Sequence, residues 1–163
     1  EVIYKIVNQS HDREVIGKAV NSMLNRIRKS QNEQSKWRLR GRDGGLLDLD
    51  LLIQAMRLEH GNLFDDTGQS PTDILDQLFA GGKINSNDFS ELSKAIRLFN
   101  EIHQCIRLTV GDENHVPDTL PKGLRTFIVT RVDVADEDQL VLSLETSLHQ
   151  VQKQLSSFTA LKR

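Results

Sequence analysis

Hydrophobic side chains recur along most of the chain at alternating spacings of three and four residues. This is the period of an α-helix that buries one face against its neighbours. We therefore expect four long helices. Their apolar positions, in chain order, are Ile16, Val20, Met23 and Ile27; Leu46, Leu49, Ile53 and Met56; Phe89, Leu92, Ile96, Phe99, His103, Ile106 and Val110; and Val141, Leu144, Leu148, Val151, Leu155 and Phe158.

Two shorter helices complete the pattern. Ser70 and Pro71 are typical of a helix start, with a serine cap followed by proline at the first helical position. The apolar face of this helix is Ile74, Leu75 and Leu78, and it ends at Gly81-Gly82. The other is expected over about 120–130, with Leu124, Phe127 and Ile128 as its apolar residues.

The helix ends and the linkers are polar and rich in glycine or asparagine. We expect Ser86 and Asn87 to cap the long middle helix, and Gly61 and Gly111 to end helices. The predicted linkers are 30–36, 62–69, 81–85 and 111–118. The predicted fold is all-α, an up-and-down helical bundle with additional short helices over 11–163. Hydrophobic residues alternate weakly over residues 2–7, which favours a short strand or an extended arm, and we expect 1–10 to be an extended arm or linker.

The composition excludes several classes of protein. With 163 residues, 37% of them hydrophobic, the chain can bury one compact core. Its net charge of -2 gives no basic face for nucleic acid, and no apolar run approaches the ~20 residues of a membrane helix. A single cysteine, Cys105, cannot form an internal disulfide. We expect a cytoplasmic protein with no nucleic-acid or membrane partner. The first residue is Glu1 rather than Met, so we expect a processed chain or a piece of a longer protein.

The most unusual stretch, residues 39–50, places glycines and arginines directly before a helix that carries Asp48 and Asp50. One interpretation is a tight turn in which Gly44-Gly45 lets the backbone bend and pack closely, and we favour it. The other is a phosphate cradle at a helix N-terminus, where free N–H groups attract anions. The spacing fits neither the P-loop nor the dinucleotide-binding motif.

Asp48 and Asp50 do not suit a shared catalytic metal. Residues two apart lie about 200° apart around a helix with ~3.6 residues per turn, so their carboxylates diverge. Asp50, Gln54 and Arg57 instead share one face, which is either solvated or a docking surface. The histidines lack metal-ligand spacing and Cys105 has no obvious base beside it. We expect no catalytic and no metal-binding residue in the chain.

The stretch from Arg42 to Gln54 resembles a motif of bacterial glutamine synthetase adenylyltransferases. In that family a helical domain follows each nucleotidyltransferase domain and carries a motif like Gly-Gly-Ile/Leu-x-Asp-Ile-Glu-Phe-x-Val-Gln. Gly44, Gly45, Asp48, the acidic Asp50 and Gln54 fall in register. Two residues depart from the motif, since Leu51 replaces its Phe and Asp50 its Glu. The resemblance covers about residues 10 to 160, and further similar segments are His60-Gly61, 70–78, 81–84 and 95–108.

The resemblance implies a helical domain of the kind associated with nucleotidyltransferases, most similar to the one after the C-terminal, AMP-adding half. The family's catalytic signature, a Gly-Ser turn with Asp-x-Asp on strands, is absent from this chain. The expected role is non-catalytic support of ATP-dependent AMP transfer to, and removal from, glutamine synthetase in nitrogen regulation. The chain itself would hold no cofactor, while ATP and Mg²⁺ would serve the full-length enzyme.

The partners implied are the adjoining nucleotidyltransferase domain, glutamine synthetase and a PII-type signalling protein. The residues expected to bind or dock are Arg42, Gly44, Gly45, Asp48, Asp50 and Gln54. Two other classes of function stay open. The chain could be a free-standing helical interaction module without catalytic activity, or a complete small enzyme that uses Asp48 and Asp50. Helical geometry argues against the second.

Overall fold

The computed structural model describes residues 10–29, 35–64, 69–111 and 116–160, and these form six α-helices and one short 3₁₀-helix. The helices are α2 (Arg13–Lys29), α3 (Leu46–Glu59), α4 (Pro71–Ala80), α5 (Ser86–Val110), α6 (Lys122–Val132) and α7 (Glu137–Thr159), and the 3₁₀-helix η1 (Gly61–Leu63) follows α3. Residues 1–9 of the predicted arm, and at least half of each of the predicted linkers 30–36, 62–69 and 111–118, lie outside the described residues. None of the described helices is both long enough and apolar enough to cross a membrane.

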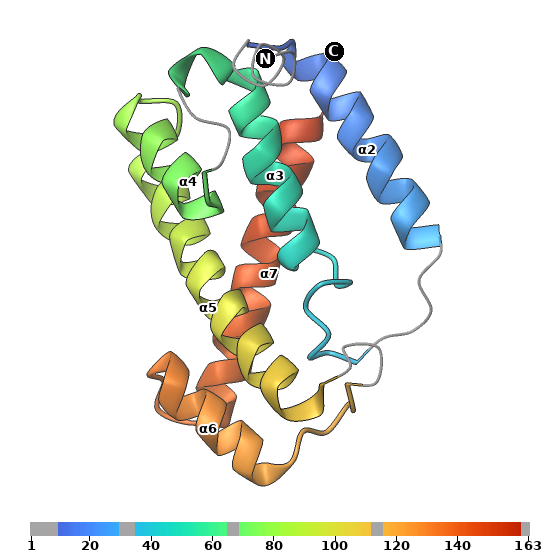
Figure 1. Cartoon of the computed structure of the whole chain (residues 1–163), viewed down its shortest axis with the longest axis vertical. Coiled ribbons are helices and arrows are strands. Elements are labelled where there is room, and N and C mark those ends of the chain that lie inside the picture. The colour runs from blue at the N-terminus through green and yellow to red at the C-terminus, as the bar shows by residue number, and fades with distance from the viewer. Residues whose placement is uncertain (1–9, 30–34, 65–68, 112–115, 161–163) are drawn as a thin grey trace.

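Four long helices, α2, α3, α5 and α7, alternate in direction along the long axis of the molecule (Figure 1). The short α4 leads into the start of α5, and α6 lies across the other end of the bundle, where α5 ends and α7 begins (Figure 1). Helices α3, α5 and α7 each pack on four other helices, so together they form the centre of the bundle. The predicted all-α, up-and-down bundle with additional short helices is confirmed.

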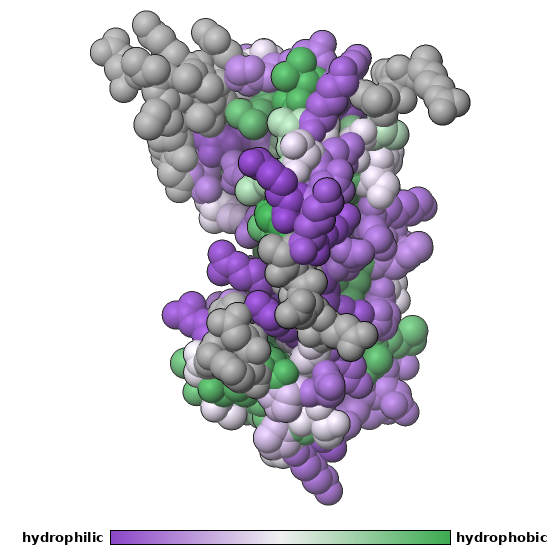
Figure 2. Space-filling view, turned by 90° about the vertical axis from the view of Figure 1, so that its right-hand side faces the viewer, coloured by the Kyte–Doolittle hydropathy of each residue, from purple (hydrophilic) through white to green (hydrophobic). Residues whose placement is uncertain are grey.

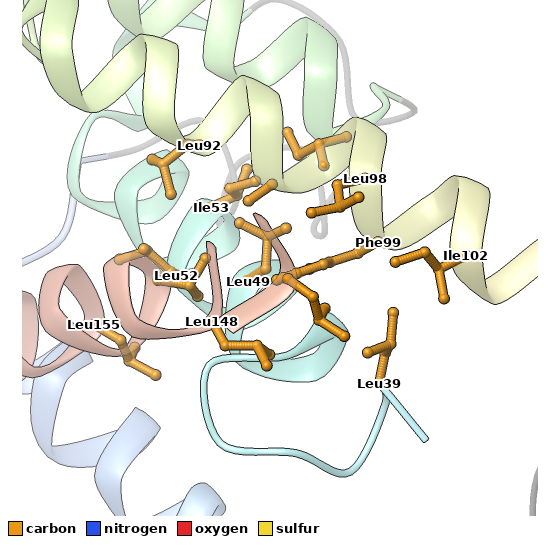
Figure 3. Packing of buried hydrophobic residues seen from close by; sticks show 14 of the residues in the cluster. Leu39, Leu49, Leu52, Ile53, Leu92, Leu98, Phe99, Ile102, Leu148 and Leu155 are labelled. Carbon is orange, nitrogen blue, oxygen red and sulfur yellow. The ribbon is translucent and has the colours of Figure 1, made fainter. Parts of the chain in front are cut away.

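One hydrophobic core joins all six helices. Its side chains come mainly from the apolar stripes that the sequence predicts on α3, α5 and α7, including Leu49, Phe99 and Leu148 (Figure 3). Two residues of the segment before α3, Trp37 and Leu39, are also buried. Because this segment has no helical period, the sequence pattern did not assign them to the core.

The helix ends follow the predicted chemistry with small shifts. The Ser70 hydroxyl accepts the Asp73 N–H while the Asp73 carboxylate accepts the Ser70 N–H, which forms a capping box on α4. Gly111 ends α5 with a φ of 77°, a conformation that glycine adopts without strain. Asn85, not Ser86 or Asn87, caps α5, and the C-cap of α3 is His60, one residue before the predicted Gly61.

Two predicted core residues face solvent. Met23 is 41% exposed, because α2 turns Leu24 rather than Met23 towards the core. Phe127 on α6 is 56% exposed, while its neighbours Leu124 and Ile128 are buried. Both helices lie at the edge of the bundle, so each has fewer neighbours to cover a third apolar position.

Helix α2 runs along the side of the molecule and touches α7 very closely at one point. A Cβ on Gly17 would lie 3.3 Å from the Cα of Thr159. Next to it, the Arg13 guanidinium stacks over the Phe158 ring at 4.4 Å, and its Nε donates to the Phe158 carbonyl at 3.3 Å. The side of the molecule that carries α2 is mostly hydrophilic, with separate hydrophobic patches (Figure 2).

Candidate functional site

The Gly44-Gly45 turn is packed so closely that neither position has room for a side chain. Gly44 has a φ of +73°, and a Cβ there would lie 2.0 Å from the carbonyl oxygen of Leu148 on α7. Gly45 has an ordinary φ of -81°, but its Cβ would lie 2.0 Å from the carbonyl oxygen of Leu39. The turn thus brings the start of α3 directly against the backbone of α7.

Three consecutive N–H groups of this turn, those of Gly44, Gly45 and Leu46, already have acceptors. Gly44 N–H donates to the Asp48 carboxylate at 2.7 Å, Gly45 N–H to the Arg42 carbonyl at 2.9 Å, and Leu46 N–H to the Leu39 carbonyl at 3.0 Å. A phosphate cradle needs such groups to be free. The geometry therefore supports the tight turn and not the cradle.

Asp48 lies at the centre of this arrangement and is only 3% exposed. Its Oδ2 accepts hydrogen bonds from Gly44 N–H at 2.7 Å and from Arg28 Nη2 on α2 at 2.8 Å. Arg28 also binds Asp43 through its Nε at 2.8 Å. Burial raises the pKa of the Asp48 carboxyl, while the Gly44 N–H and the Arg28 guanidinium oppose the rise. Asp48 therefore joins the turn, α2 and α3.

Arg42 ties the same turn to α7. Its Nη2 donates to both carboxylate oxygens of Glu145, at 3.1 and 3.2 Å, and its Nη1 donates to the Lys36 carbonyl at 2.9 Å. Arg28 and Glu145, the charged partners of this network, were missed by the sequence analysis. Both residues are distant from the motif in the sequence. A local sequence pattern cannot show that these particular residues of α2 and α7 face the turn.

Asp50 and Gln54 lie apart from this network, on an exposed part of α3. Asp50 borders a hollow of about 250 Å³ between α3, the start of α4 and α5, together with Arg40, Pro71, Asn100 and His103. Although the residue as a whole is exposed, the packing around its carboxyl group raises its pKa, and the positive charge of Arg40 opposes the rise. This pair of side chains can form hydrogen bonds with a neighbouring surface.

Arg57 does not share the exposed face of Asp50 and Gln54. The prediction that these three residues lie on one face of the helix is therefore wrong for Arg57. It is 3% exposed, and its guanidinium carbon lies 5.3 Å from the centre of the Phe64 ring. The chain turns back over the end of α3 through η1 and buries this residue. Spacing along α3 alone could not show that covering segment.

The described residues contain no group of three or more histidine, cysteine or acidic side chains that could hold a metal ion. Asp48 is buried and Asp50 is exposed, so the two carboxylates face different surroundings on α3. Burial also raises the pKa of the Cys105 thiol, which disfavours the reactive thiolate. The geometry of this part of the chain gives no support to a complete small enzyme based on Asp48 and Asp50.

Comparison with known proteins gives one consistent result. The chain is 28% identical over 153 residues to the bifunctional glutamine synthetase adenylyltransferase/adenylyl-removing enzyme of Bartonella quintana (strain Toulouse), covering 92% of the chain. The enzymes with the same name from Rhodopseudomonas palustris (strain BisB5) and Bradyrhizobium diazoefficiens are 26% and 25% identical, over 86% and 93% of the chain. The chain is homologous to one segment of the adenylyltransferases.

The chain spans only 14–15% of the length of these three adenylyltransferases. No protein-family model matches it, and no solved structure gives a significant match. The six residues taken from the adenylyltransferase motif separate into two groups in the structure. Arg42, Gly44, Gly45 and Asp48 lie together in the packed turn, whereas Asp50 and Gln54 are exposed.

Proposed function

We propose that the chain is a non-catalytic helical domain of a glutamine synthetase adenylyltransferase. In this proposal it is the domain after the C-terminal, AMP-adding half. It supports the transfer of AMP from ATP to glutamine synthetase and the removal of AMP from glutamine synthetase, in the regulation of nitrogen metabolism. The observation that carries the proposal is that the alignments cover nearly the whole chain but only a small segment of much longer enzymes.

The two groups of motif residues would have different roles. The packed turn of Arg42, Gly44, Gly45 and Asp48 would set the position of α3 against α2 and α7. Asp50 and Gln54 would then face the adjoining nucleotidyltransferase domain, with a carboxylate and an amide that can accept and donate hydrogen bonds. Arg40 and His103, which border the same hollow as Asp50, would add donors to this surface.

The other participants in the reaction would act outside this chain. In this proposal ATP and Mg²⁺ would be bound by the nucleotidyltransferase domain of the full-length enzyme. Glutamine synthetase would be the protein substrate and a PII-type signalling protein a regulatory partner of the whole enzyme. The reaction would take place in the cytoplasm.

The test is carried out in the full-length enzyme with Asp50→Ala and Gln54→Ala. If this surface orients the catalytic domain, each change should lower both AMP transfer to glutamine synthetase and AMP removal by about tenfold, because small misplacement of reacting groups is costly. The melting temperature should not change, since both residues are exposed. Transfer is followed with labelled ATP.

The matched control is Asp76→Ala, an exposed acid on α4. It should leave both activities unchanged. Full activity of Asp50→Ala and Gln54→Ala, with correct folding, would contradict the proposed docking role. AMP transfer by the isolated chain with Mg²⁺ and ATP would contradict its non-catalytic nature.

A further inference from the structure

A second surface lies between α5 and α7, and none of its lining residues belongs to the Gly44-Gly45 turn. It is a groove of about 510 Å³, and its lining comes from α5, from the end of α6 with the turn that follows, and from α7. Its apolar residues are Leu98, Val132, Val134 and Leu142. Leu142 is 59% exposed and Val132 and Val134 are half-buried, while Leu98 is buried beneath them as part of the core.

The shape of the groove suits another helix. Its wall on α5 extends from Glu91 to Glu101, which is about 15 Å, or three turns, at ~1.5 Å per residue. The wall on α7 beyond Leu142 consists of small side chains, Ser143, Thr146 and Ser147, which let a neighbouring backbone approach closely. Two parallel rows of side chains on packed helices form the kind of groove into which a third helix fits.

The charges on the rim select the kind of helix. Lys94 pairs with Glu91 at 3.5 Å, and Arg131 pairs with Glu101 at 2.7 Å. Arg97 lines the same groove and has no acidic partner among the described residues. The groove therefore carries one uncompensated positive charge, although the whole chain has a net charge of -2.

We propose that this groove binds an amphipathic α-helix of a partner protein segment, with apolar side chains on Leu142, Val132 and Val134 and an acidic residue against Arg97. The apolar contacts supply most of the affinity, while the acid sets the register and orientation of the bound helix. The surface is distinct from Asp50 and Gln54, so the binding does not depend on the docking role proposed for those residues.

The experiment measures binding of a fluorescein-labelled model helix of about 18 residues by fluorescence anisotropy. The peptide carries leucines at helical spacing with glutamates beside them, and the control peptide carries lysines in place of the glutamates. The chain should bind the glutamate peptide at least about tenfold more tightly than the lysine peptide. Leu142→Asp should weaken binding by about tenfold or more, and Arg97→Glu should reverse the preference between the peptides.

Two matched variants outside the groove control for general effects. Leu108→Asp changes another exposed leucine, and Lys122→Glu reverses another exposed positive charge. Both should bind like the unaltered chain, and circular dichroism checks that every variant is folded. Equal binding of the two peptides, absence of binding, or equal effects of Leu142→Asp and Leu108→Asp would overturn the proposal. A dimer that Leu142→Asp converts to a monomer in sedimentation would overturn it in favour of a second copy.

Discussion

Asp48 and Asp50 are two residues apart on the same helix, yet their surroundings have little in common. Asp48 is buried and accepts hydrogen bonds from the Gly44 N–H and from Arg28. Asp50 is exposed and borders an open hollow with Arg40 and His103. A short motif can therefore contain residues of two kinds, some that hold the fold and some that are presented to a partner. Because both residues are aspartate, the residue type alone does not distinguish these two roles.

The glycines offer the strongest test of the first kind of residue. Gly44→Ala adds both a strained φ and a clash with the Leu148 carbonyl, so we expect a loss of about 4 kcal/mol of unfolding free energy. Gly45→Ala adds no backbone strain, only clashes with the carbonyl oxygens of Leu39 and Arg42, and should cost about 2 kcal/mol. Urea unfolding followed by circular dichroism measures both.

Gly82→Ala is the matched control for these two glycines. Its φ is +66°, but a Cβ there meets nothing within 4 Å, so only the backbone strain of about 1 kcal/mol remains. If all three variants lost the same free energy, the close approach of the turn to α7 would not matter for stability. That result would remove the structural role assigned to the turn.

The two aspartates can be compared directly by truncation. Asp48→Ala leaves the buried Gly44 N–H without its acceptor and removes the Arg28 pair, so we expect a loss of about 2 kcal/mol. Asp50→Ala should stay within about 0.5 kcal/mol of the unaltered chain, because the residue is exposed. Thermal or urea unfolding of the two variants measures both losses of unfolding free energy. Equal losses would show that the division drawn between these carboxylates is wrong.

The smallest expected effect is a pH dependence that belongs to Asp48. Burial raises its folded-state pKa above the ordinary 3.8, so the folded protein holds this proton more strongly than the unfolded chain. Its contribution to stability is therefore greatest at low pH and falls as the pH rises through the carboxyl range to the folded-state pKa. The Asp48→Asn variant has no carboxyl group at this position, so it lacks this pH-dependent contribution to stability.

Measured from about pH 3 to pH 7, the stability of the unaltered chain relative to Asp48→Asn should fall as the pH rises. Urea unfolding at each pH gives both values under the same conditions. A difference that is constant or that grows with pH would contradict the raised pKa. Asp50→Asn, measured in the same way, shows whether the partly covered carboxyl of Asp50 behaves similarly.

The sequence predicted the helices better than it predicted the site. The apolar stripes of α5 and α7 and the Ser70-Pro71 start of α4 are local patterns, and they are confirmed. Met23, Phe127 and Arg57 were placed on the wrong side, because their exposure depends on which neighbouring segments cover them.

The site itself depends on contacts between distant parts of the chain. The motif includes the Gly44-Gly45 turn, but the charged partners of Asp48 and Arg42 are Arg28 on α2 and Glu145 on α7. The hydrophobic periodicity of α2 and α7 does not show which of their charged residues face the turn. The groove between α5 and α7 was likewise invisible in the sequence, because Leu142 lies beside the predicted stripe of α7 rather than in it.

The contact between Arg13 and Phe158 has a mechanical consequence. Helices α2 and α7 run in opposite directions, so the start of α2 and the end of α7 meet at one end of the bundle (Figure 1). A force that pulls these two ends apart acts on the Arg13 contacts first and then separates the helices one turn at a time. The two helices would separate progressively from this end of the bundle, at a lower force than if they had to slide along each other.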